Sequence, residues 1–250
     1  GPEEALRAIG EVMRERRFGA SGAEIVIEER LEGQEASFYA ICDGERFAVF
    51  SHAQDHKRAL DGDLGENTGG MGAYSPAGPI DAALEREIVE TIVRPTVAGM
   101  RAEGRPFRGA LFVGLMIDAG RPRVIEFNAR FGDPETQALL FRLESDLVPL
   151  LVGAAEGRLP DDPAPVRFGD PAVCVVLASE GYPRGYPTGR EIRGLDALTG
   201  LPDAKVFHSG TRRVEGRWQT AGGRVLGVTA RGATLEVARS RAYELAARVR

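Results

Sequence analysis

Apolar and polar residues follow one another along this chain in patterns that predict a mixture of helices and strands. Apolar residues recur every three or four positions where we expect helices, and in alternating or β-branched runs where we expect strands. The predicted helices are residues 3–17, 81–99, 136–156 and 234 onward. The predicted strands are residues 24–28, 35–41, 47–50, 109–118, 123–128, 172–178, 205–208 and 224–230. Together these elements predict an α+β fold.

A long polar segment, residues 51–78, separates two of these predicted elements and shows almost no periodicity. Six glycines lie in the central part of the segment. They are Gly62, Gly65, Gly69, Gly70, Gly72 and Gly78. A loop of this length inside a compact domain is usually functional or disordered, so we interpret this segment as a candidate binding loop.

A stretch rich in proline and aspartate, residues 158–170, is the predicted boundary between two domains. On this interpretation residues 1–157 form one domain and residues 171–250 form a smaller second one. The chain begins without methionine and ends at Arg250 inside a helical pattern. We therefore expect it to be a fragment of a longer protein.

Composition excludes several classes of function. The chain has 32 Lys and Arg against 37 Asp and Glu, a formal net charge of −5, and the two signs are interspersed, so no nucleic-acid footprint is present. With 43% hydrophobic residues the chain builds real cores, yet no stretch approaches the roughly 20 apolar residues of a membrane span. Cys42 and Cys174 are lone, widely separated thiols, which indicates a reducing cytosol.

The predicted strand 123–128 carries the strongest chemical signal. Because side chains alternate along a strand, Glu126, Asn128 and Arg130 are expected on one face. Carboxylate and amide oxygens suit Mg²⁺, which takes few protein ligands and completes its shell with water and phosphate oxygens. The guanidinium of Arg130 suits the phosphates themselves. The alternative is a polar outer face at a sheet edge, with Arg130 paired to Glu126.

Two acidic residues follow this face through a turn made by Gly132 and Pro134. Asp133 and Glu135 are candidates to orient a small amine or an amino acid. They are equally placed to cap the helix that begins near Thr136, where negative charge favours the helix dipole. For Glu135 we favour capping.

A second candidate site begins at the predicted strand 24–28. Adenine needs one hydrogen-bond acceptor and one donor, which exposed backbone at residues 29–31 supplies after Glu28. A ribose needs a carboxylate for its hydroxyls, and Glu35 has suitable spacing. The alternative is a hairpin whose acidic side chains are solvated.

The third candidate joins a charged run, residues 54–58, to a glycine-rich run, residues 67–76. Glycine lets backbone N–H groups approach an oxyanion closely, and Lys57 and Arg58 are placed to meet a phosphate or carboxylate. The alternative is a mobile, solvated loop. Neither a P-loop nor a Gly-x-Ser-x-Gly motif is present.

Five motifs occur in the order found in phosphoribosylamine–glycine ligases, also called glycinamide ribonucleotide synthetases, of the ATP-grasp superfamily. The chain resembles that family over nearly its whole length, most specifically in Asn-Thr-Gly-Gly-Met-Gly-Ala-Tyr-Ser-Pro and Glu-Phe-Asn-Ala-Arg-Phe-Gly-Asp-Pro-Glu. The motifs are residues 26–31, 54–58, 67–76, 124–135 and 222–226.

The resemblance implies the C-terminal half of an ATP-grasp domain, an antiparallel sheet with flanking helices, followed by a small α/β domain. It implies ligation of glycine to 5-phosphoribosylamine with ATP and Mg²⁺ or Mn²⁺, through a glycyl phosphate, in purine biosynthesis. The implied metal ligands are Glu126 and Asn128. The implied nucleotide contacts are Glu28, Glu29, Leu31 and Glu35, and the implied catalytic residues are Arg130, Lys57 and Asp133. The implied substrate contacts are Asp55, His56, Arg58, Asn67, Thr68, Gly69, Gly70 and Met71.

The chain also departs from the family pattern. It lacks the family's Rossmann-like substrate domain, its nucleotide-binding lysine and its glycine-rich phosphate lid. On the strand before 123–128 only Asp118, at the end, is acidic. The alternatives are a nucleotide-binding fragment without activity, or another ATP-grasp ligase. We expect a cytoplasmic monomer that binds small molecules and neither nucleic acid nor membrane.

Overall fold

The computed structural model of the protein describes residues 1–161 and 163–250. The chain folds into two compact units, residues Gly1–Glu32 and Gly33–Arg250.

The first unit is mostly helical. It contains α1 (Pro2–Ile9), a π-helical turn (Gly10–Arg14) and a 3₁₀ turn (Gly19–Gly22), which confirms the predicted first helix up to residue 14. The prediction of a strand over residues 24–28 is wrong, because no described strand pairs with this segment. A strand needs a neighbour for its backbone hydrogen bonds. The side chains of Val26 and Ile27 are accordingly 85% and 75% exposed.

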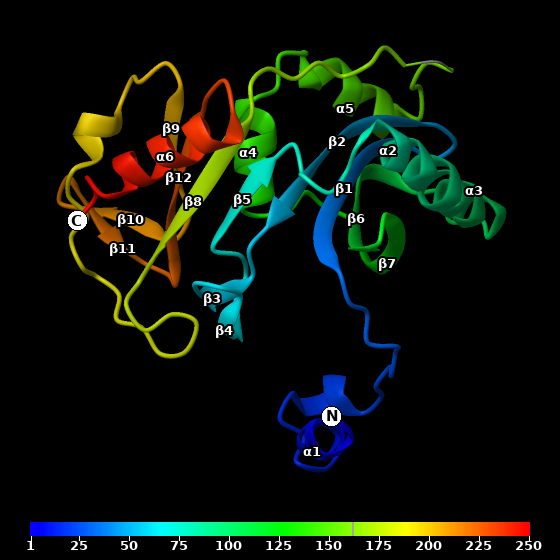
Figure 1. The fold of residues 1–250 in the computed structure, drawn as a ribbon, viewed down its shortest axis with the longest axis horizontal. Coiled ribbons are helices and arrows are strands. Elements are labelled where there is room, and N and C mark those ends of the chain that lie inside the picture. The colour runs from blue at the N-terminus through cyan, green and yellow to red at the C-terminus, as the bar shows by residue number, and fades with distance from the viewer. Residues whose placement is uncertain (162) are drawn as a thin grey trace. The chain divides into compact units, whose positions relative to one another are not determined.

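The second unit is built on an eight-stranded antiparallel sheet in the order β7-β6-β1-β2-β5-β8-β12-β9 (Figure 1). Its strands are β1 (Gln34–Asp43), β2 (Phe47–Asp55), β5 (Gly72–Ser75), β6 (Arg108–Asp118), β7 (Arg121–Asn128), β8 (Ala172–Ala178), β9 (Ala204–His208) and β12 (Arg224–Arg231). Mixed helices on a large antiparallel sheet confirm the α+β prediction.

Helices cover both faces of the sheet at the β7-β6-β1-β2 end. On one face pack α2 (Ala82–Ile88), a π-helical turn (Val89–Val93) and α3 (Arg94–Ala102). The other face is covered by α4 (Glu135–Phe141) and α5 (Leu147–Glu156). Strand β1 alternates between the two cores: Phe38 and Ala40 join the first core, whereas Tyr39 and Ile41 join the second.

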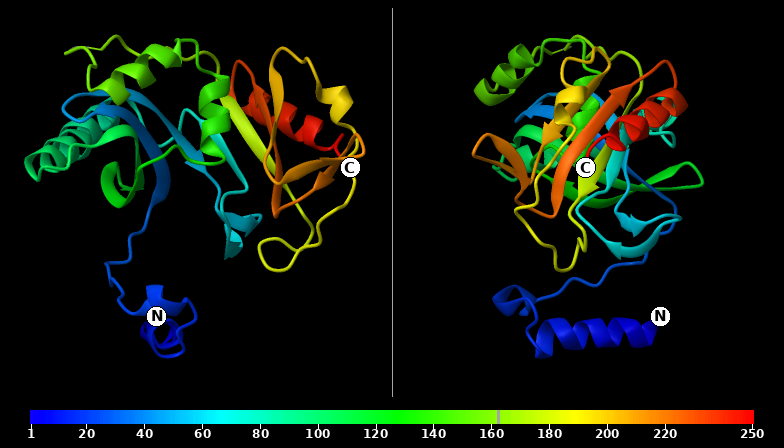
Figure 2. Two further views of the ribbon diagram at one scale, coloured as in Figure 1. Left: turned by 180° about the vertical axis from the view of Figure 1, so that it is seen from behind. Right: turned by 90° about the vertical axis from the view of Figure 1, so that its left-hand side faces the viewer.

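The C-terminal strands carry one long helix, α6 (Leu235–Ala246), packed on β8, β12 and β9 (Figure 2). The hydroxyl of Thr234 accepts a hydrogen bond from the amide of Val237 and so caps α6. The helix ends at Ala246, so the helical pattern predicted to run through Arg250 stops before that residue.

Tertiary pairing overrides two further predictions. The polar segment 51–78 is not one loop: β2 runs to Asp55, and β3 (Arg58–Leu60), β4 (Leu64–Asn67) and β5 follow it. Their pairing is set by neighbouring strands and not by local apolar periodicity. The helix predicted over 136–156 is two helices, because Asp146 caps the start of α5 with its carboxylate. The hairpin of β10 (Thr211–Val214) and β11 (Arg217–Thr220) was not predicted.

The predicted linker, residues 158–170, connects α5 to β8, and residue 162 within it lies outside the described residues. Strand β8 pairs with β5, so one sheet continues from residues before this segment to residues after it. The division into 1–157 and 171–250 stays a prediction.

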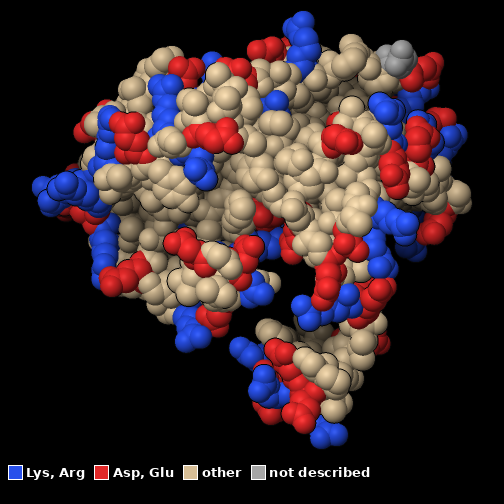
Figure 3. Space-filling view, viewed as in Figure 1, with Lys and Arg blue, Asp and Glu red and all other residues tan. Residues whose placement is uncertain are grey.

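Within residues 1–161 and 163–250, none of the helices has the length and apolar character to cross a membrane. Both cysteines are buried free thiols. On the face drawn in Figure 3, basic and acidic side chains are interspersed.

Candidate active site

The predicted metal ligands lie on the edge strand β7. Opposite Glu126 stands Gly114 of β6, and opposite Asn128 stands Phe112. The amide nitrogen Nδ2 of Asn128 donates to Oε1 of Glu126 at 2.9 Å. The two side chains therefore share one face, as strand alternation predicts.

A β-bulge at Ile125 decides which face this is. The register shifts there, so that Val124 lies opposite Leu115 and packs against the core beneath α2 and α3. Without the bulge, Glu126 would share that buried face with Val124. The extra residue turns Glu126 to the opposite face, the one covered further along the sheet by α4 and α5.

Arg130 is not part of this strand. Strand β7 ends at Asn128, so the predicted alternation does not extend to Arg130. Its guanidinium is exposed and donates to the main-chain oxygen of Phe131 at 3.1 Å. The alternative of an ion pair between Arg130 and Glu126 is not found in the described structure.

Lys57 lies at the centre of a polar cluster beside Glu126. Its Nζ is 2.6 Å from Oε2 of Glu35 on β1. Asp55, at the end of β2, and Glu126 act on the same ammonium, and all four side chains line one small recess. The structure thus brings together a predicted catalytic residue, a predicted ribose contact, a predicted substrate contact and a predicted metal ligand.

Burial and charge oppose each other in this cluster. Burial alone would lower the pKa of Lys57, but the hydrogen bond with Glu35 and the carboxylates of Asp55 and Glu126 outweigh it and raise the pKa. Burial raises the pKa of Asp55, and Lys57 offsets part of that rise. Lys57 therefore stays a cation near neutral pH, and it is placed to meet an anionic ligand.

The donor set at this place fits a divalent cation that is also held by phosphate. Glu126 offers a carboxylate, and Asn128 keeps its carbonyl oxygen because it donates to Glu126 through nitrogen. Among the described residues no group of three or more His, Cys, Asp or Glu could hold a metal alone. Two oxygen ligands are the usual protein share for Mg²⁺ bound to a nucleotide.

Asp118 is too far along β6 to join these ligands. It lies four residues beyond Gly114, the partner of Glu126, which at strand geometry is about 13 Å. Gly114 itself leaves room for Glu126, since a Cβ there would lie 3.2 Å from its Cγ.

Glu135 is buried, and its role was missed in the sequence. The residue is 3% exposed, and its Oε1 accepts hydrogen bonds from the hydroxyls of Ser37 and Tyr39, each at 3.2 Å. The carboxylate also lies in the first turn of α4, as expected, and accepts a hydrogen bond from its own backbone amide. Its contacts with Ser37 and Tyr39 of β1 are the part that the sequence did not predict.

The glycine-rich loop is attached to residues far away in the sequence. The guanidinium of Arg224, the first residue of β12, donates to the main-chain oxygens of Gly69 and Asp133 and forms a 3.0 Å ion pair with the carboxylate of Asp133. The hydroxyl of Tyr182 accepts from the amide of Gly69 at 3.0 Å. Arg224 belongs to the quoted 222–226 motif, which was the only sequence signal for its position.

The loop is also attached to the charged run before it. The amide and hydroxyl of Thr68 both donate to the main-chain oxygen of Lys57, at 2.7 and 2.9 Å. The amide of Met71 donates to the main-chain oxygen of His56 at 2.7 Å. Asn67 pairs with Arg58 across the β3–β4 hairpin. These bonds order the loop, which excludes the alternative of a freely solvated segment.

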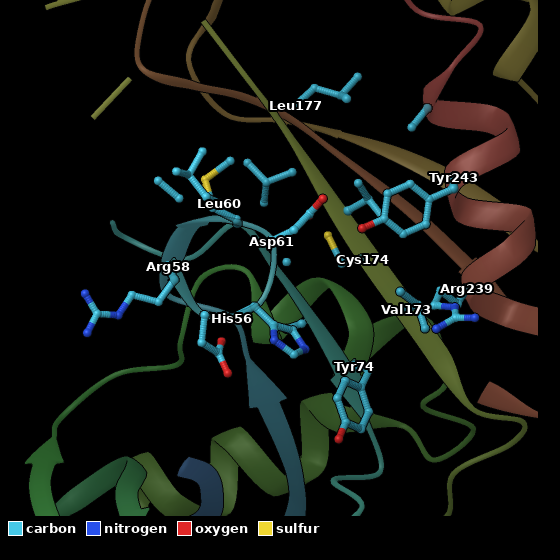
Figure 4. A pocket seen from close by; sticks show the side chains of 18 of the residues that line it. His56, Arg58, Leu60, Asp61, Tyr74, Val173, Cys174, Leu177, Arg239 and Tyr243 are labelled. Atoms are coloured by element: carbon cyan, nitrogen blue, oxygen red, sulfur yellow. The ribbon is translucent and has the colours of Figure 1, made fainter. Parts of the chain in front are cut away.

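The charged run divides between two places. Asp55 and Lys57 line the recess beside Glu126, whereas His56 and Arg58 line a separate cavity of about 870 Å³ with Met71. Figure 4 shows this cavity between the β3–β4 region and α6, whose Tyr243 and Arg239 lie on the far side of β8 from His56. The predicted substrate contacts are therefore not gathered in one pocket.

The predicted adenine contacts lie in the first unit. Glu28 and Glu29 are exposed and Leu31 is half-buried, in a segment without regular secondary structure. Glu35 lies on β1 and belongs to the second unit. The roles of Glu28, Glu29 and Leu31 stay predictions.

Comparison with known families gives two matches along the chain. The family model described as phosphoribosylglycinamide synthetase, ATP-grasp (A) domain, matches residues 1–136. The model of the C domain of the same enzyme matches residues 172–250. The unmatched segment between them contains the predicted linker.

Individual relatives agree with these family models. The chain is 53% identical over 234 residues to phosphoribosylamine–glycine ligase of Phenylobacterium zucineum, covering 93% of this chain and 55% of the relative. Among solved structures it is similar to phosphoribosylamine–glycine ligase of Thermotoga maritima, with a TM-score of 0.79, 35% identity and coverage of 89% and 54%. The chain thus spans about half the length of these relatives.

A more distant likeness concerns the fold alone. The biotin carboxylase domain of 2-oxoglutarate carboxylase from Hydrogenobacter thermophilus, in complex with MgADP and bicarbonate, matches with a TM-score of 0.70 and 17% identity. The match covers 97% of this chain and 51% of that one.

Proposed function

Because the chain belongs to the phosphoribosylglycinamide synthetase family, we propose that it forms the metal-binding and substrate-binding part of an ATP-dependent ligase that joins glycine to 5-phosphoribosylamine. The products are glycinamide ribonucleotide, ADP and phosphate. The observation that carries the proposal is the cluster of Glu35, Asp55, Lys57 and Glu126 beside Asn128 on one face of the sheet. The chain spans about half of its relatives, so the complete reaction is itself part of the proposal.

The proposed metal ligands are Glu126 and Asn128. A Mg²⁺ ion bound there supplies positive charge that neutralises nucleotide phosphates. Mn²⁺ offers the same coordination preference for oxygen donors. Glu126 and Asn128 hold fixed positions because both belong to a paired strand, and the bulge at Ile125 directs them to the site.

Lys57 and Arg130 are the proposed cationic groups for the phosphates. Phosphoryl transfer needs positioned positive charge more than a protein nucleophile. Lys57 is held by Glu35 at 2.6 Å, and Arg130 is exposed on the turn after β7. Each can reorient its side chain toward an incoming phosphate at the cost of one hydrogen bond.

The proposed chemistry has two steps. A carboxylate oxygen of glycine attacks the γ-phosphorus of ATP, the bond to the β-phosphate oxygen breaks, and ADP leaves with the bonding electron pair. The amine of phosphoribosylamine then attacks the acyl carbon, phosphate leaves, and the amine loses a proton. Asp133, Asp55, His56, Arg58 and the 67–71 loop are the proposed groups that hold the two substrates.

The nucleotide contacts are proposed from the same family membership. Glu28, Glu29 and Leu31 are proposed to meet adenine, and Glu35 to meet the ribose. In the structure Glu35 is already engaged by Lys57, so ribose hydroxyls would share this carboxylate with the lysine. We further propose a cytoplasmic, monomeric protein.

The test is ADP formation with ATP, Mg²⁺, glycine and phosphoribosylamine. It is run with the 250-residue chain and with the chain extended by its flanking reading frame. Omission of each substrate in turn is the first control, and Glu126→Ala is the second. Dependence of ADP formation on both glycine and phosphoribosylamine supports the ligase, whereas nucleotide binding without turnover in either form supports a non-catalytic nucleotide-binding protein.

A further inference from the structure

The buried carboxylate of Glu135 accepts hydrogen bonds from two residues of the sheet. Each of these residues lies in the same cross-strand row as one of the proposed metal ligands. Across β1, β6 and β7 one row contains Ser37, Gly114 and Glu126. The next row toward the end of β7 contains Tyr39, Phe112 and Asn128. The hydroxyls of Ser37 and Tyr39 both donate to Oε1 of Glu135 at 3.2 Å.

This register gives the turn between β7 and α4 two fixed ends. The chain leaves the sheet after Asn128 on the edge strand and returns at Glu135, which is attached to the third strand inward. Neighbouring strands are about 4.8 Å apart, so the turn spans about 10 Å across the face. Arg130 and Asp133 lie within this span.

The packing beneath the turn leaves no free space. A Cβ added at Gly132 would lie 2.4 Å from the hydroxyl of Tyr39 and 2.6 Å from the carboxylate of Glu135. The ring of Phe131 lies 6.1 Å from that of Tyr39, centre to centre. Tyr39 and Glu135 are both buried, so the turn is held by groups that water does not reach.

The first turn of α4 holds the same segment from its other side. The amide of Thr136 donates to the main-chain oxygen of Gly132 at 3.1 Å, and its hydroxyl contacts the same oxygen. The amide nitrogen of Gln137 donates to Oδ1 of Asp133 at 2.6 Å. A shift of Glu135 would therefore move Asp133 as well.

From these contacts we infer that Glu135 is a positioning residue: its hydrogen bonds to Ser37 and Tyr39 fix Arg130 and Asp133 relative to the metal ligands Glu126 and Asn128. The inference rests on the proposed function for the roles of Arg130 and Asp133. Glu135 itself touches no substrate. Its contribution is geometric, and misplacement of reacting groups by about 1 Å costs as much as about 100-fold in rate.

The experiment compares four variants: Glu135→Gln, Glu135→Ala, Tyr39→Phe and Ser37→Ala. Gln keeps an oxygen acceptor for both hydroxyls, whereas Ala removes it. We expect Glu135→Ala and Tyr39→Phe to lower kcat by about 10-fold or more with little change in KM for ATP. Glu135→Gln should recover most of kcat. The double variant Tyr39→Phe/Glu135→Ala should lose less than the product of the single losses, because both remove one interaction.

A second readout does not depend on turnover. Amide hydrogen exchange in residues 129–133 should be faster in Tyr39→Phe than in the unaltered protein, while exchange in β1 and β6 stays slow. Mn²⁺ binding measured by electron paramagnetic resonance should change less than twofold, because the metal ligands belong to β7. The control is Ile88→Ala, which opens the core on the opposite face of the sheet, lowers stability, and should leave kcat of the folded protein unchanged.

The possible results distinguish a failure of the positioning role of Glu135 from a failure of the proposed ligase function. If Tyr39→Phe and a folded Glu135→Ala keep the kcat and exchange pattern of the unaltered protein, the positioning role is wrong. If Glu135→Ala does not fold, Tyr39→Phe and Ser37→Ala decide the matter by the same two readouts. If the unaltered protein never forms ADP, the proposed function is wrong, and the rate of amide exchange in the turn of Tyr39→Phe still tests whether Glu135 holds the turn.

Discussion

The guanidinium of Arg224 lies 3.0 Å from the carboxylate of Asp133 and donates to the main-chain oxygen of the same residue at 2.7 Å. Ninety-one residues separate the two in the sequence. The same guanidinium also donates to Gly69, so one side chain joins β12, the turn before α4 and the glycine-rich loop.

Replacement of Arg224 should release the loop. We expect Arg224→Ala to lower kcat/KM for the substrates by at least about 10-fold and to lower the free energy of unfolding by about 2 kcal/mol, as is usual for hydrogen bonds that involve a charged group. Arg224→Lys keeps the positive charge but loses the planar guanidinium, so its losses of kcat/KM and of stability should lie between those of the unaltered protein and Arg224→Ala. The exposed Arg190, paired with Glu180, supplies the control: Arg190→Ala should change stability by less than about 0.5 kcal/mol. Equal effects of both Ala variants would contradict the role of Arg224.

Removal of the proposed metal ligand Glu126 should separate catalysis from folding. Glu126→Ala should abolish ADP formation and weaken Mn²⁺ binding, while thermal unfolding changes little because Glu126 is exposed at a sheet edge. Asn128→Ala should act in the same direction with a smaller effect, since an amide is a weaker ligand than a carboxylate. Unchanged turnover in Glu126→Ala would exclude this residue as a ligand.

The fork geometry of Arg130 is expected to matter for turnover. Arg130→Lys keeps the positive charge but loses the planar pair of donors that matches a phosphate. We expect kcat to fall by at least about 10-fold, with stability unchanged because the side chain is exposed and bonded only to the main-chain oxygen of Phe131. Steady-state kinetics of the variant beside Arg105→Lys, at an exposed position away from the site, checks this, and a near-normal rate would remove Arg130 from the mechanism.

Alanine substitutions at two glycines with left-handed backbone separate the cost of backbone strain from the cost of a steric clash. Gly70 has φ +109, and a Cβ there would lie 2.5 Å from Cδ of Pro134. Gly62 has φ +70, with nothing within 4 Å of such a Cβ. Gly62→Ala should cost only the conformational penalty of about 1 kcal/mol. Gly70→Ala should cost about 1–3 kcal/mol more, because the loop must move from Pro134, and should raise KM. Chemical denaturation of both variants measures the difference.

Acid should destabilise the protein through His52. Burial, with a smaller contribution from Arg142, lowers the pKa of His52 from its ordinary value to about 4. Its Nδ1 accepts from the amide of Ala77 at 2.9 Å, and the carboxylate of Glu85 lies 3.9 Å from Nε2. The unfolded chain binds the proton more readily, so the stabilisation is complete above about pH 6.5 and is lost as pH falls toward 4.

The size of this effect follows from the difference in pKa. A shift from about 6.5 to about 4 corresponds to as much as about 3 kcal/mol. Urea unfolding between pH 7 and pH 4 should show a steeper loss for the unaltered protein than for His52→Asn. Parallel curves would mean that His52 does not carry the acid sensitivity. Other carboxyls titrate in both proteins, so the difference between the two curves is the quantity that counts.

Much of the local structure could be predicted from the order of residues. Strand 172–178 was predicted with the bounds of β8, and the alternation in Glu126-Phe127-Asn128 placed both proposed metal ligands on one face. Such features depend on neighbours along the chain, where periodicity and side-chain chemistry act directly. The family motifs were predictable for the same reason, because each is a contiguous run.

Elements whose partners are distant in the chain were predicted less well. The polar segment 51–78 forms three short strands and the end of β2 because other strands lie beside it. The predicted strand 24–28 contains three β-branched residues, Ile25, Val26 and Ile27, yet it forms no strand, because no described strand lies beside it. Backbone hydrogen bonds between strands are non-local, and apolar periodicity says little about them.

In the candidate site, too, some features follow from the residue types alone and others depend on contacts between distant parts of the chain. Residue types alone indicated a divalent cation, a phosphate and an acidic contact for ribose. The folded chain decided the rest: Lys57 pairs with Glu35 in the recess that Glu126 also lines, His56 faces another cavity, and Glu135 accepts hydrogen bonds from β1. A bulge of one residue at Ile125 sets which face Glu126 occupies. These arrangements depend on register and packing across the sheet, which are set by contacts between residues far apart in the chain.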